Sequence, residues 1–152
     1  MARAFLMLVC GLGGVSASLA CPFCAKLTRS HADEIRENPL VLFGAFEGPE
    51  RFLIRTVIKG TPALRDGESV SVQGTGLASQ NQPVDRLLFG KWDDSTVRPA
   101  RMEVADARFA NYLAEVARIE GTSKAQRLEF FFQYLDSTHA RIASDAYAEF
   151  AK

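Results

Sequence analysis

Two cysteines near the start of the chain are the residues whose type and spacing most directly suggest chemistry. Cys21 and Cys24 enclose a proline and a phenylalanine in a CPFC motif. Such a pair can close as a disulfide, or act as a redox couple with Cys21 as the attacking thiolate and Cys24 as the resolving thiol. Thiolates also bind zinc, so the pairs of two chains could together hold one metal ion. Ala25 follows the motif, which argues against the CxxCH signature of covalent haem attachment.

The segment before the motif predicts export. Arg3 is a short positive start, residues 5–15 are an apolar run, and Ser18-Leu19-Ala20 places small residues at −3 and −1 of a cleavage point. We therefore expect residues 1–20 to be a signal peptide and the mature protein to be periplasmic or extracellular, where disulfides persist. The apolar run is too short for a membrane span, so we expect none after cleavage. The alternative is a lipoprotein with a lipid anchor at Cys21, although the usual lipobox has Leu at −3.

The composition limits the classes of protein to which the chain can belong. Its 152 residues are 47% hydrophobic, which is enough for the core of one ordinary domain. Lys plus Arg and Asp plus Glu both number 18, so there is no electrostatic footprint for nucleic acid. The sequence has no Ser-His-Asp set, Walker loop, Rossmann glycine fingerprint or HExxH motif. We expect no cofactor and, more generally, a protein without catalytic activity.

Histidines and paired carboxylates are the other groups that could do acid–base chemistry, and we interpret them as structural. His31 lies on the apolar face of a predicted helix, where a histidine is more often a satisfied structural residue than a ligand. His139 is expected to be exposed at a helix start, and neither histidine has a carboxylate partner in a recognisable arrangement. Three acidic pairs are interpreted as solvated or capping groups: Asp33-Glu34, Asp93-Asp94 and Asp145 with Glu149.

The spacing of apolar residues predicts a helix followed by five strands. The helix spans 25–37, with Leu27, His31 and Ile35 on one face. Short strands with a period of two follow at 40–46, 51–59, 68–73, 86–92 and 97–104. In the second strand Phe52, Ile54, Thr56 and Ile58 are predicted to share a face. Gly90 suggests a bulge, Trp92 is assigned to the core, and 74–83 is a polar loop.

Three helices are predicted after the strands. Asp106 is the expected N-cap of a helix that ends near Ile119, and Ser123 opens another through a capping box. A last helix spans roughly 139–151. The apolar stripes of the second and third of these helices are expected to be core, and they comprise Leu128, Phe131, Phe132 and Leu135, then Ile142, Ala146, Tyr147 and Phe150.

Strands grouped before helices predict an α+β fold. Five strands of modest length suit a small OB-like barrel, followed by C-terminal helices. We therefore divide the chain into a signal peptide at 1–20, a β-domain at 21–105 that carries the CxxC and a short helix, and a helical segment at 106–152.

The segment from Cys21 to about Val104 resembles the OB-fold superfamily of netrin modules and tissue inhibitors of metalloproteinases. The resemblance rests on the N-terminal cysteines and short helix, on Pro39 to Gly44 as a first strand, and on Phe52 to Gly60 as a strand that ends in Lys-Gly. That family has CxC with later cysteines as partners, so the disulfide that anchors its N-terminus has no counterpart here. In the inhibitors the N-terminal cysteine chelates a protease zinc, and only Cys21 could take that role.

The stretch from Arg127 to Ala151 looks like one HEAT-type helical pair. Nearly the whole mature chain is also similar to uncharacterised secreted bacterial proteins that combine an N-terminal CPFC, a β-region and a helical array, a resemblance that implies no known activity. A single helical pair cannot bury both of its faces. We therefore expect either a truncated member of that group, or an open helical face that packs on the barrel or on another copy.

These observations favour an exported, non-catalytic binding or scaffold module with an unknown protein partner. One alternative is a thiol–disulfide redox protein that uses Cys21 and Cys24. A thioredoxin-like CxxC follows a core strand, however, and here it follows a signal peptide. The other alternative is a protein that captures metal through Cys21 and Cys24, or that is anchored by a lipid at Cys21.

Overall fold

A computed structural model of the chain describes residues 29–74 and 84–152. The expected signal peptide, the cysteines of the CPFC motif and the start of the predicted helix 25–37 lie outside the described residues. So does nearly all of the polar loop 74–83.

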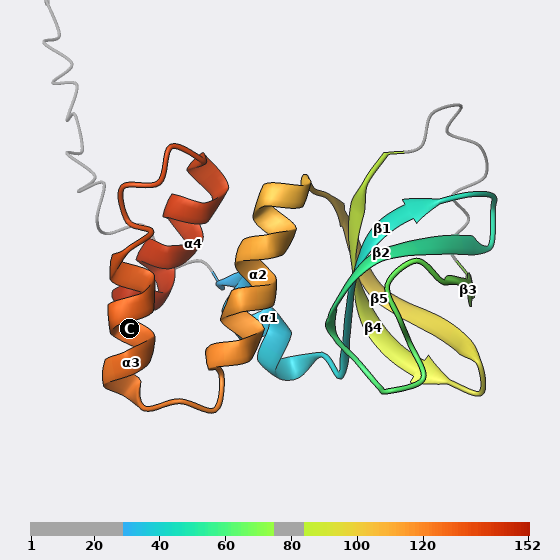
Figure 1. Cartoon of the computed structure of the whole chain (residues 1–152), viewed down its shortest axis with the longest axis horizontal. Helices are drawn as coiled ribbons and strands as arrows, with labels where there is room; N and C mark the ends of the chain where they lie inside the picture. Colours follow the sequence, from blue (N-terminus) through green and yellow to red (C-terminus); the bar gives the residue numbers. More distant parts are fainter. Residues whose placement is uncertain (1–28, 75–83) are drawn as a thin grey trace, which may run out of the picture.

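Five strands form one sheet that closes on itself (Figure 1). Their order around the closed sheet is β1-β2-β3-β5-β4, and β4 pairs with β1. Four of the pairings are antiparallel, whereas β3 and β5 are parallel. The bounds confirm the five predicted strands: β1 Leu40–Phe46, β2 Arg51–Lys59, β3 Ser69–Val72, β4 Arg86–Asp93 and β5 Thr96–Val104.

Two register shifts in the pairing of β1 with β2 change which side chains of β2 face the inside of the closed sheet. The register skips one residue at Arg55 and another at Ile58, and an extra residue of this kind bends a strand and re-aims its side chains. Val57 joins Phe52 and Ile54 inside, while Ile58 faces the helices. The prediction of one shared face through Ile58 was therefore wrong.

Gly90 marks a bulge, as predicted. The register of β4 with β5 shifts between Phe89 and Gly90, and a Cβ at Gly90 would overlap the carbonyl oxygen of Arg98. At the end of this hairpin Asp94 and Ser95 have φ of 42° and 71°. Positive φ at both central residues is the requirement of a type I′ turn, whose twist matches that of the flanking strands.

The described residues form four helices beside the closed sheet: α1 His31–Glu37, α2 Ala107–Ile119, α3 Lys124–Phe132 and α4 Ala140–Phe150. Both predicted caps are confirmed, because Asp106 accepts a hydrogen bond from the N–H of Phe109 and Ser123 forms a capping box with Gln126. Ser30 and Asp33 make a further capping box at the start of α1. Because the backbone of Ser30 is extended there, the helix begins at His31, and the prediction of one helix over 25–37 was wrong at its start. None of these helices has the length and apolar character of a membrane span.

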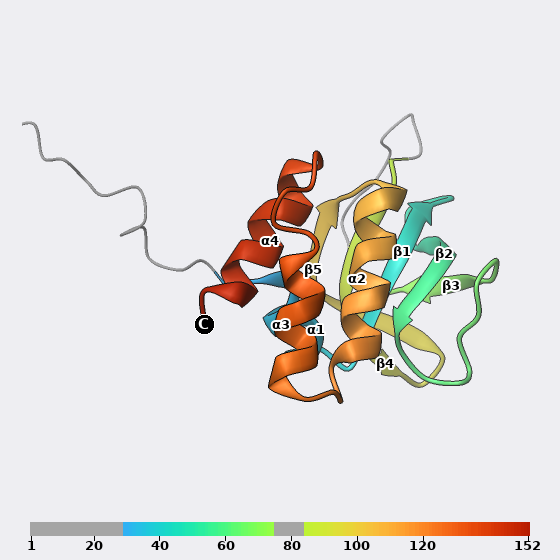
Figure 2. The ribbon, with the colours of Figure 1, turned by 60° about the vertical axis from the view of Figure 1, so that its left-hand side comes forward.

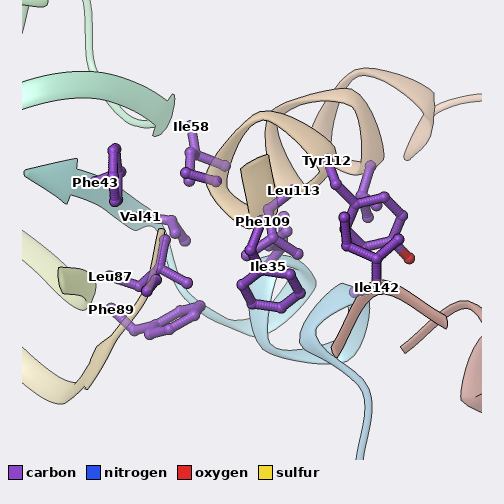
Figure 3. Packing of buried hydrophobic residues seen from close by; sticks show 14 of the residues in the cluster. Ile35, Val41, Phe43, Ile58, Leu87, Phe89, Phe109, Tyr112, Leu113 and Ile142 are labelled. Carbon is purple, nitrogen blue, oxygen red and sulfur yellow. The ribbon is translucent and has the colours of Figure 1, made fainter. Parts of the chain in front are cut away.

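The helices form layers on one side of the closed sheet (Figures 1 and 2). Helices α1 and α2 lie between the sheet and the pair formed by α3 and α4. Strand β1 is buried on both faces, which explains its unbroken apolar sequence LVLFGAF. One apolar cluster fills the inside of the closed sheet. The other joins the outer faces of β1, β2 and β4 to all four helices (Figure 3).

The outer helical pair departs from the predicted core stripes. Phe131 is 2% exposed and packs inward, but its neighbour Phe132 is 63% exposed. Tyr147 and Phe150 are also exposed, whereas Ile142 and Ala146 are buried as predicted. Assigning Phe132, Tyr147 and Phe150 to the core was therefore wrong, because no further layer of the described chain covers the outside of this pair.

Candidate functional site

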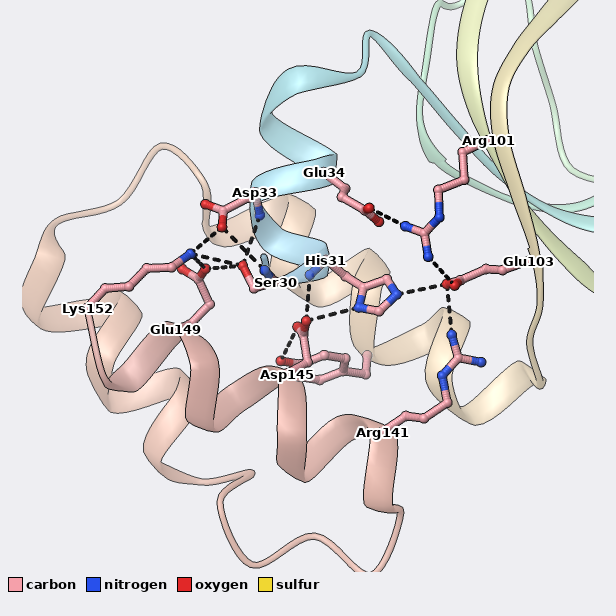
Figure 4. A network of polar contacts seen from close by, with 11 residues as sticks. Ser30, His31, Asp33, Glu34, Arg101, Glu103, Arg141, Asp145, Glu149 and Lys152 are labelled. Atoms are coloured by element: carbon pink, nitrogen blue, oxygen red, sulfur yellow. Dashed lines mark hydrogen bonds and ion pairs between the residues drawn. The ribbon is translucent and has the colours of Figure 1, made fainter. Parts of the chain in front are cut away.

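Polar side chains gather between α1, the end of β5 and α4 (Figure 4). This polar network is half-buried and joins the start of the described chain to its last helix and to the closed sheet. We define it by its members: Ser30, His31, Asp33, Glu34 and Arg36, then Arg101, Glu103 and Tyr112, and finally Arg141, Asp145, Glu149 and Lys152.

His31 lies at the centre of the polar network. Its Nδ1 is 3.1 Å from Oδ1 of Asp145, and its Nε2 is 2.8 Å from Oε1 of Glu103. Burial opposes the charged form, but the hydrogen bonds to these two carboxylates outweigh it and raise the pKa of His31 to about 9. The imidazole is therefore held as an imidazolium that donates from both nitrogens at neutral pH. The ring also meets Phe109 edge to face, with centroids 4.9 Å apart.

Asp145 is the buried carboxylate of the network, at 5% exposure. It accepts a hydrogen bond from the backbone N–H of His31 at 2.6 Å, in addition to the bond with the imidazole. Its other oxygen accepts from the hydroxyl of Tyr112 at 3.0 Å. Burial and this carboxylate raise the pKa of Tyr112, so the phenol stays protonated and remains a donor. Three donors thus compensate the cost of burying the charge.

Glu103 connects the end of β5 to the same histidine. Besides His31, its carboxylate accepts from Arg101 at 2.5 Å and from Arg141 at 2.7 Å. Burial opposes ionisation, but His31 and the two guanidinium groups keep the pKa of Glu103 below its usual value. The guanidinium of Arg141 also lies 4.1 Å from the centroid of the Phe109 ring. A cation over an aromatic face adds to the attraction.

Glu149 organises the other half of the network, one turn after Asp145 on α4. Burial opposes its ionisation, but Lys152, Ser30 and Arg36 all donate to it and keep the pKa of Glu149 below its usual value. Arg36 also reaches Glu120 beyond the end of α2, at 3.0 Å. Lys152 donates to Asp33 at 2.5 Å. Helix α1 and Lys152 are thus held by one set of charges.

In this geometry His31 is not placed to act as the base of an Asp–His pair at neutral pH. An Asp–His pair activates a nucleophile when the second ring nitrogen is available to take a proton. Here that nitrogen faces Glu103, and both nitrogens already carry protons. The nearby Ser30 hydroxyl donates to Glu149 instead. A hollow of about 140 Å³ lies beside His31, but neither ring nitrogen is free to bond to a molecule in it. The arrangement binds helices to the sheet.

Several sequence interpretations need correction at this site. Both histidines do have carboxylate partners, because the second, His139, bonds to Asp106 at 2.8 Å and stacks on Phe109. His139 is therefore not exposed, at 17% for its side chain. The pair Asp145 and Glu149 is buried rather than solvated. Asp33 is a capping group as predicted.

The missed carboxylates left a signal in the sequence. Asp145 and Glu149 fall three and seven residues after Ile142, on the buried side of α4 and in phase with Ala146. A charge on a helix's apolar stripe indicates a partner from another element, and that signal points to the network. The partners of the two carboxylates on and beside α1 could not be assigned, because Ser30, His31 and Arg36 lie more than 100 residues away in sequence.

Cys21 and Cys24, the predicted disulfide, redox and metal-binding residues, lie outside the described residues. Within residues 29–74 and 84–152, no group of three or more His, Cys, Asp or Glu side chains is arranged to hold a metal ion.

A second candidate site is the aromatic face on the outside of α3 and α4, which we define as Leu128, Phe132, Tyr147 and Phe150. The rings of Phe132 and Phe150 are 6.0 Å apart, so the exposed aromatics from the two helices are contiguous. In the part of the chain that the structure describes, the other large exposed apolar side chain is Val104 on β5. Contiguous exposed apolar surface of this kind marks interaction sites.

Comparisons with known proteins assign no family to the chain, so its function is argued from the geometry of the two candidate sites. No protein-family model matches the chain, and no curated protein matches it significantly.

Proposed function

We propose that the protein is an exported, non-catalytic binding module that engages a protein partner through the aromatic face of α3 and α4. The observation that carries the proposal is the exposure of Phe132, Tyr147 and Phe150, at 63%, 46% and 41%. Aromatic side chains are enriched at the centres of protein interfaces, where they bury large areas at a low cost in conformational entropy.

The fold supports a scaffold that presents this face rigidly. The strand order and the parallel β3–β5 pair agree with an OB-like barrel, and the α3–α4 hairpin agrees with a HEAT-like unit. The polar network fixes the hairpin to the sheet through α1, since His31 bonds to Glu103 on β5 and to Asp145 on α4. A binding surface on rigid elements loses little entropy when a partner docks.

The internal bonding of the polar network supports a binding role over a catalytic one. Its charged side chains bond to one another, and the central imidazole has no free nitrogen. The redox and lipid-anchor alternatives depend on Cys21 and Cys24. A Cys24→Ser variant that traps a mixed disulfide would support the redox alternative.

A photo-crosslinker placed at position 132 tests the proposal. The exported protein carries benzoylphenylalanine in place of Phe132 and is irradiated in the producing cells. A matched control carries the same group at Lys91, an exposed position on β4. We expect a discrete adduct from position 132 and none from position 91. Equal labelling at both positions, or none at either, would contradict the proposal.

A further inference from the structure

We propose that the partner of the aromatic face is a second copy of this chain, and that α3 packs antiparallel on α3 of the partner copy across a two-fold axis. The inference rests on the proposed function and names its partner. It comes from the order of side chains along the outside of α3. When this order is reversed and laid on itself, apolar residues meet apolar residues and opposite charges meet each other.

The row along α3 repeats every four residues. Lys124, Leu128 and Phe132 are separated by four positions, so they lie on one side of the helix, and Asp136 follows in the turn after it. Reversing this row and laying it on itself places Leu128 against Phe132 of the second copy. The same register places Lys124 against Asp136 of the second copy. A two-fold axis requires each contact to occur twice, and this row satisfies that requirement.

The charges of this row are available for such a contact. Among the described residues, the side chains of Lys124 and Asp136 have no hydrogen bond or ion pair within the chain, and both residues are exposed. This separates them from Lys152 and Arg36 nearby, whose donors are occupied by Glu149 and other carboxylates. One end of the row is thus positive and the other negative, which favours an antiparallel pair and disfavours a parallel one.

The size of the aromatic face sets the expected affinity of the two copies for each other. Its three exposed rings offer about 300 Å² of aromatic surface, judged from the usual area of such side chains. A standard interface buries about 800 Å² on each partner, so the rings form the centre of the contact and the flanks of α3 and α4 must supply the rest. We therefore expect a weak dimer with a dissociation constant on the order of tens of micromolar.

Sedimentation velocity of the mature protein between about 1 μM and 1 mM tests the inference. The wild-type chain should shift from monomer to dimer across this range, and Phe132→Glu should remain monomeric because it places a charge at the centre of the contact. Lys91→Glu on β4 is the matched control and should dimerise like the wild type. A monomer at every concentration, or a dimer that Phe132→Glu leaves intact, overturns the inference.

Charge reversal tests the register. Lys124→Glu and Asp136→Lys should each weaken the dimer about tenfold, because each turns two symmetric attractions into repulsions. Neither change should impair folding, since an acid at the start of a helix and a base after its end suit the helix dipole. The double variant should recover most of the wild-type affinity. Failure of that recovery overturns the antiparallel arrangement.

The crosslinking experiment separates this inference from the proposed function. An adduct at position 132 with twice the mass of the mature chain agrees with a second copy. An adduct of any other mass, together with a monomer in sedimentation, leaves the binding function standing and overturns self-association. Absence of both an adduct and a dimer contradicts both.

Discussion

His31 keeps its proton at neutral pH because each ring nitrogen faces a carboxylate from a different element. Glu103 comes from β5 and Asp145 from α4, so the cation holds the closed sheet and the last helix to α1. A buried histidine that links three elements in this way stabilises the folded state only while it is protonated. The pH dependence of stability therefore reports on this contact directly.

The stability of the protein should fall as pH rises from about 6.5 to 9. The pKa of His31 is raised to about 9 in the folded state from 6.5, so its contribution is complete below 6.5 and is lost as pH passes 9. We expect a loss on the order of 2–3 kcal/mol across this window. Urea unfolding at pH 6, 7.5 and 9 measures it. His31→Gln should flatten the profile. A wild-type profile as flat as that of His31→Gln would contradict the assignment.

At the residue scale, the sequence indicated which side chains cap helices, but it did not indicate which distant side chains bond to each other. Capping groups such as Asp106 and Ser123 could be recognised because they bond within three residues of themselves. The partners of His31 could not, because contacts over 72 and 114 positions depend on how the elements pack. Phe131 and Phe132 show the same limit, since both suit an apolar stripe and only the neighbouring helices decide which one is buried.

At the scale of elements, two glycines allow the strands of the closed sheet to approach each other at register shifts. Gly44 in β1 and Gly90 in β4 both lie directly after a shift in pairing. A Cβ at Gly44 would overlap the carbonyl oxygen of Leu53, and one at Gly90 that of Arg98. The sequence predicted the bulge at Gly90. The bulge at Ile58 has no glycine beside it, and the bulge at Arg55 is marked only on the opposite strand, by Gly44, which is why the face of β2 was assigned wrongly.

Alanine at either glycine should destabilise the protein. Because the new methyl group would meet backbone rather than a movable side chain, we expect Gly44→Ala and Gly90→Ala each to lower the free energy of unfolding by about 1–3 kcal/mol or more. Gly121→Ala is the matched control, since a Cβ there has no atom within 4 Å. Urea unfolding measures all three. A cost at Gly90 no greater than at Gly121 would mean that the strands can separate at the bulge without penalty.

At the scale of the whole molecule, one apolar cluster crosses the domain boundary that was predicted between residues 105 and 106. It contains Val41 and Leu87 from the closed sheet, Phe109 from α2 and Phe131 from α3. The polar network crosses the same boundary through His31. Sheet and helices therefore share both their apolar and their charged contacts, and we expect them to unfold as one unit.

Phe131→Ala tests this coupling from the helical side. Truncating this buried ring should lower the free energy of unfolding by about 3–5 kcal/mol. Trp92, the single tryptophan, lies on β4, so its fluorescence reports on the sheet, while circular dichroism at 222 nm reports mainly on the helices. Both signals should move to the same lower urea midpoint. Phe132→Ala, one residue away and 63% exposed, is the matched control and should cost less than about 1 kcal/mol at 1 μM protein, where any dimer is dissociated. If Phe131→Ala moved the helical signal and left the Trp92 transition in place, the closed sheet would be a folding unit of its own, and the aromatic face would be carried by a separable helical module.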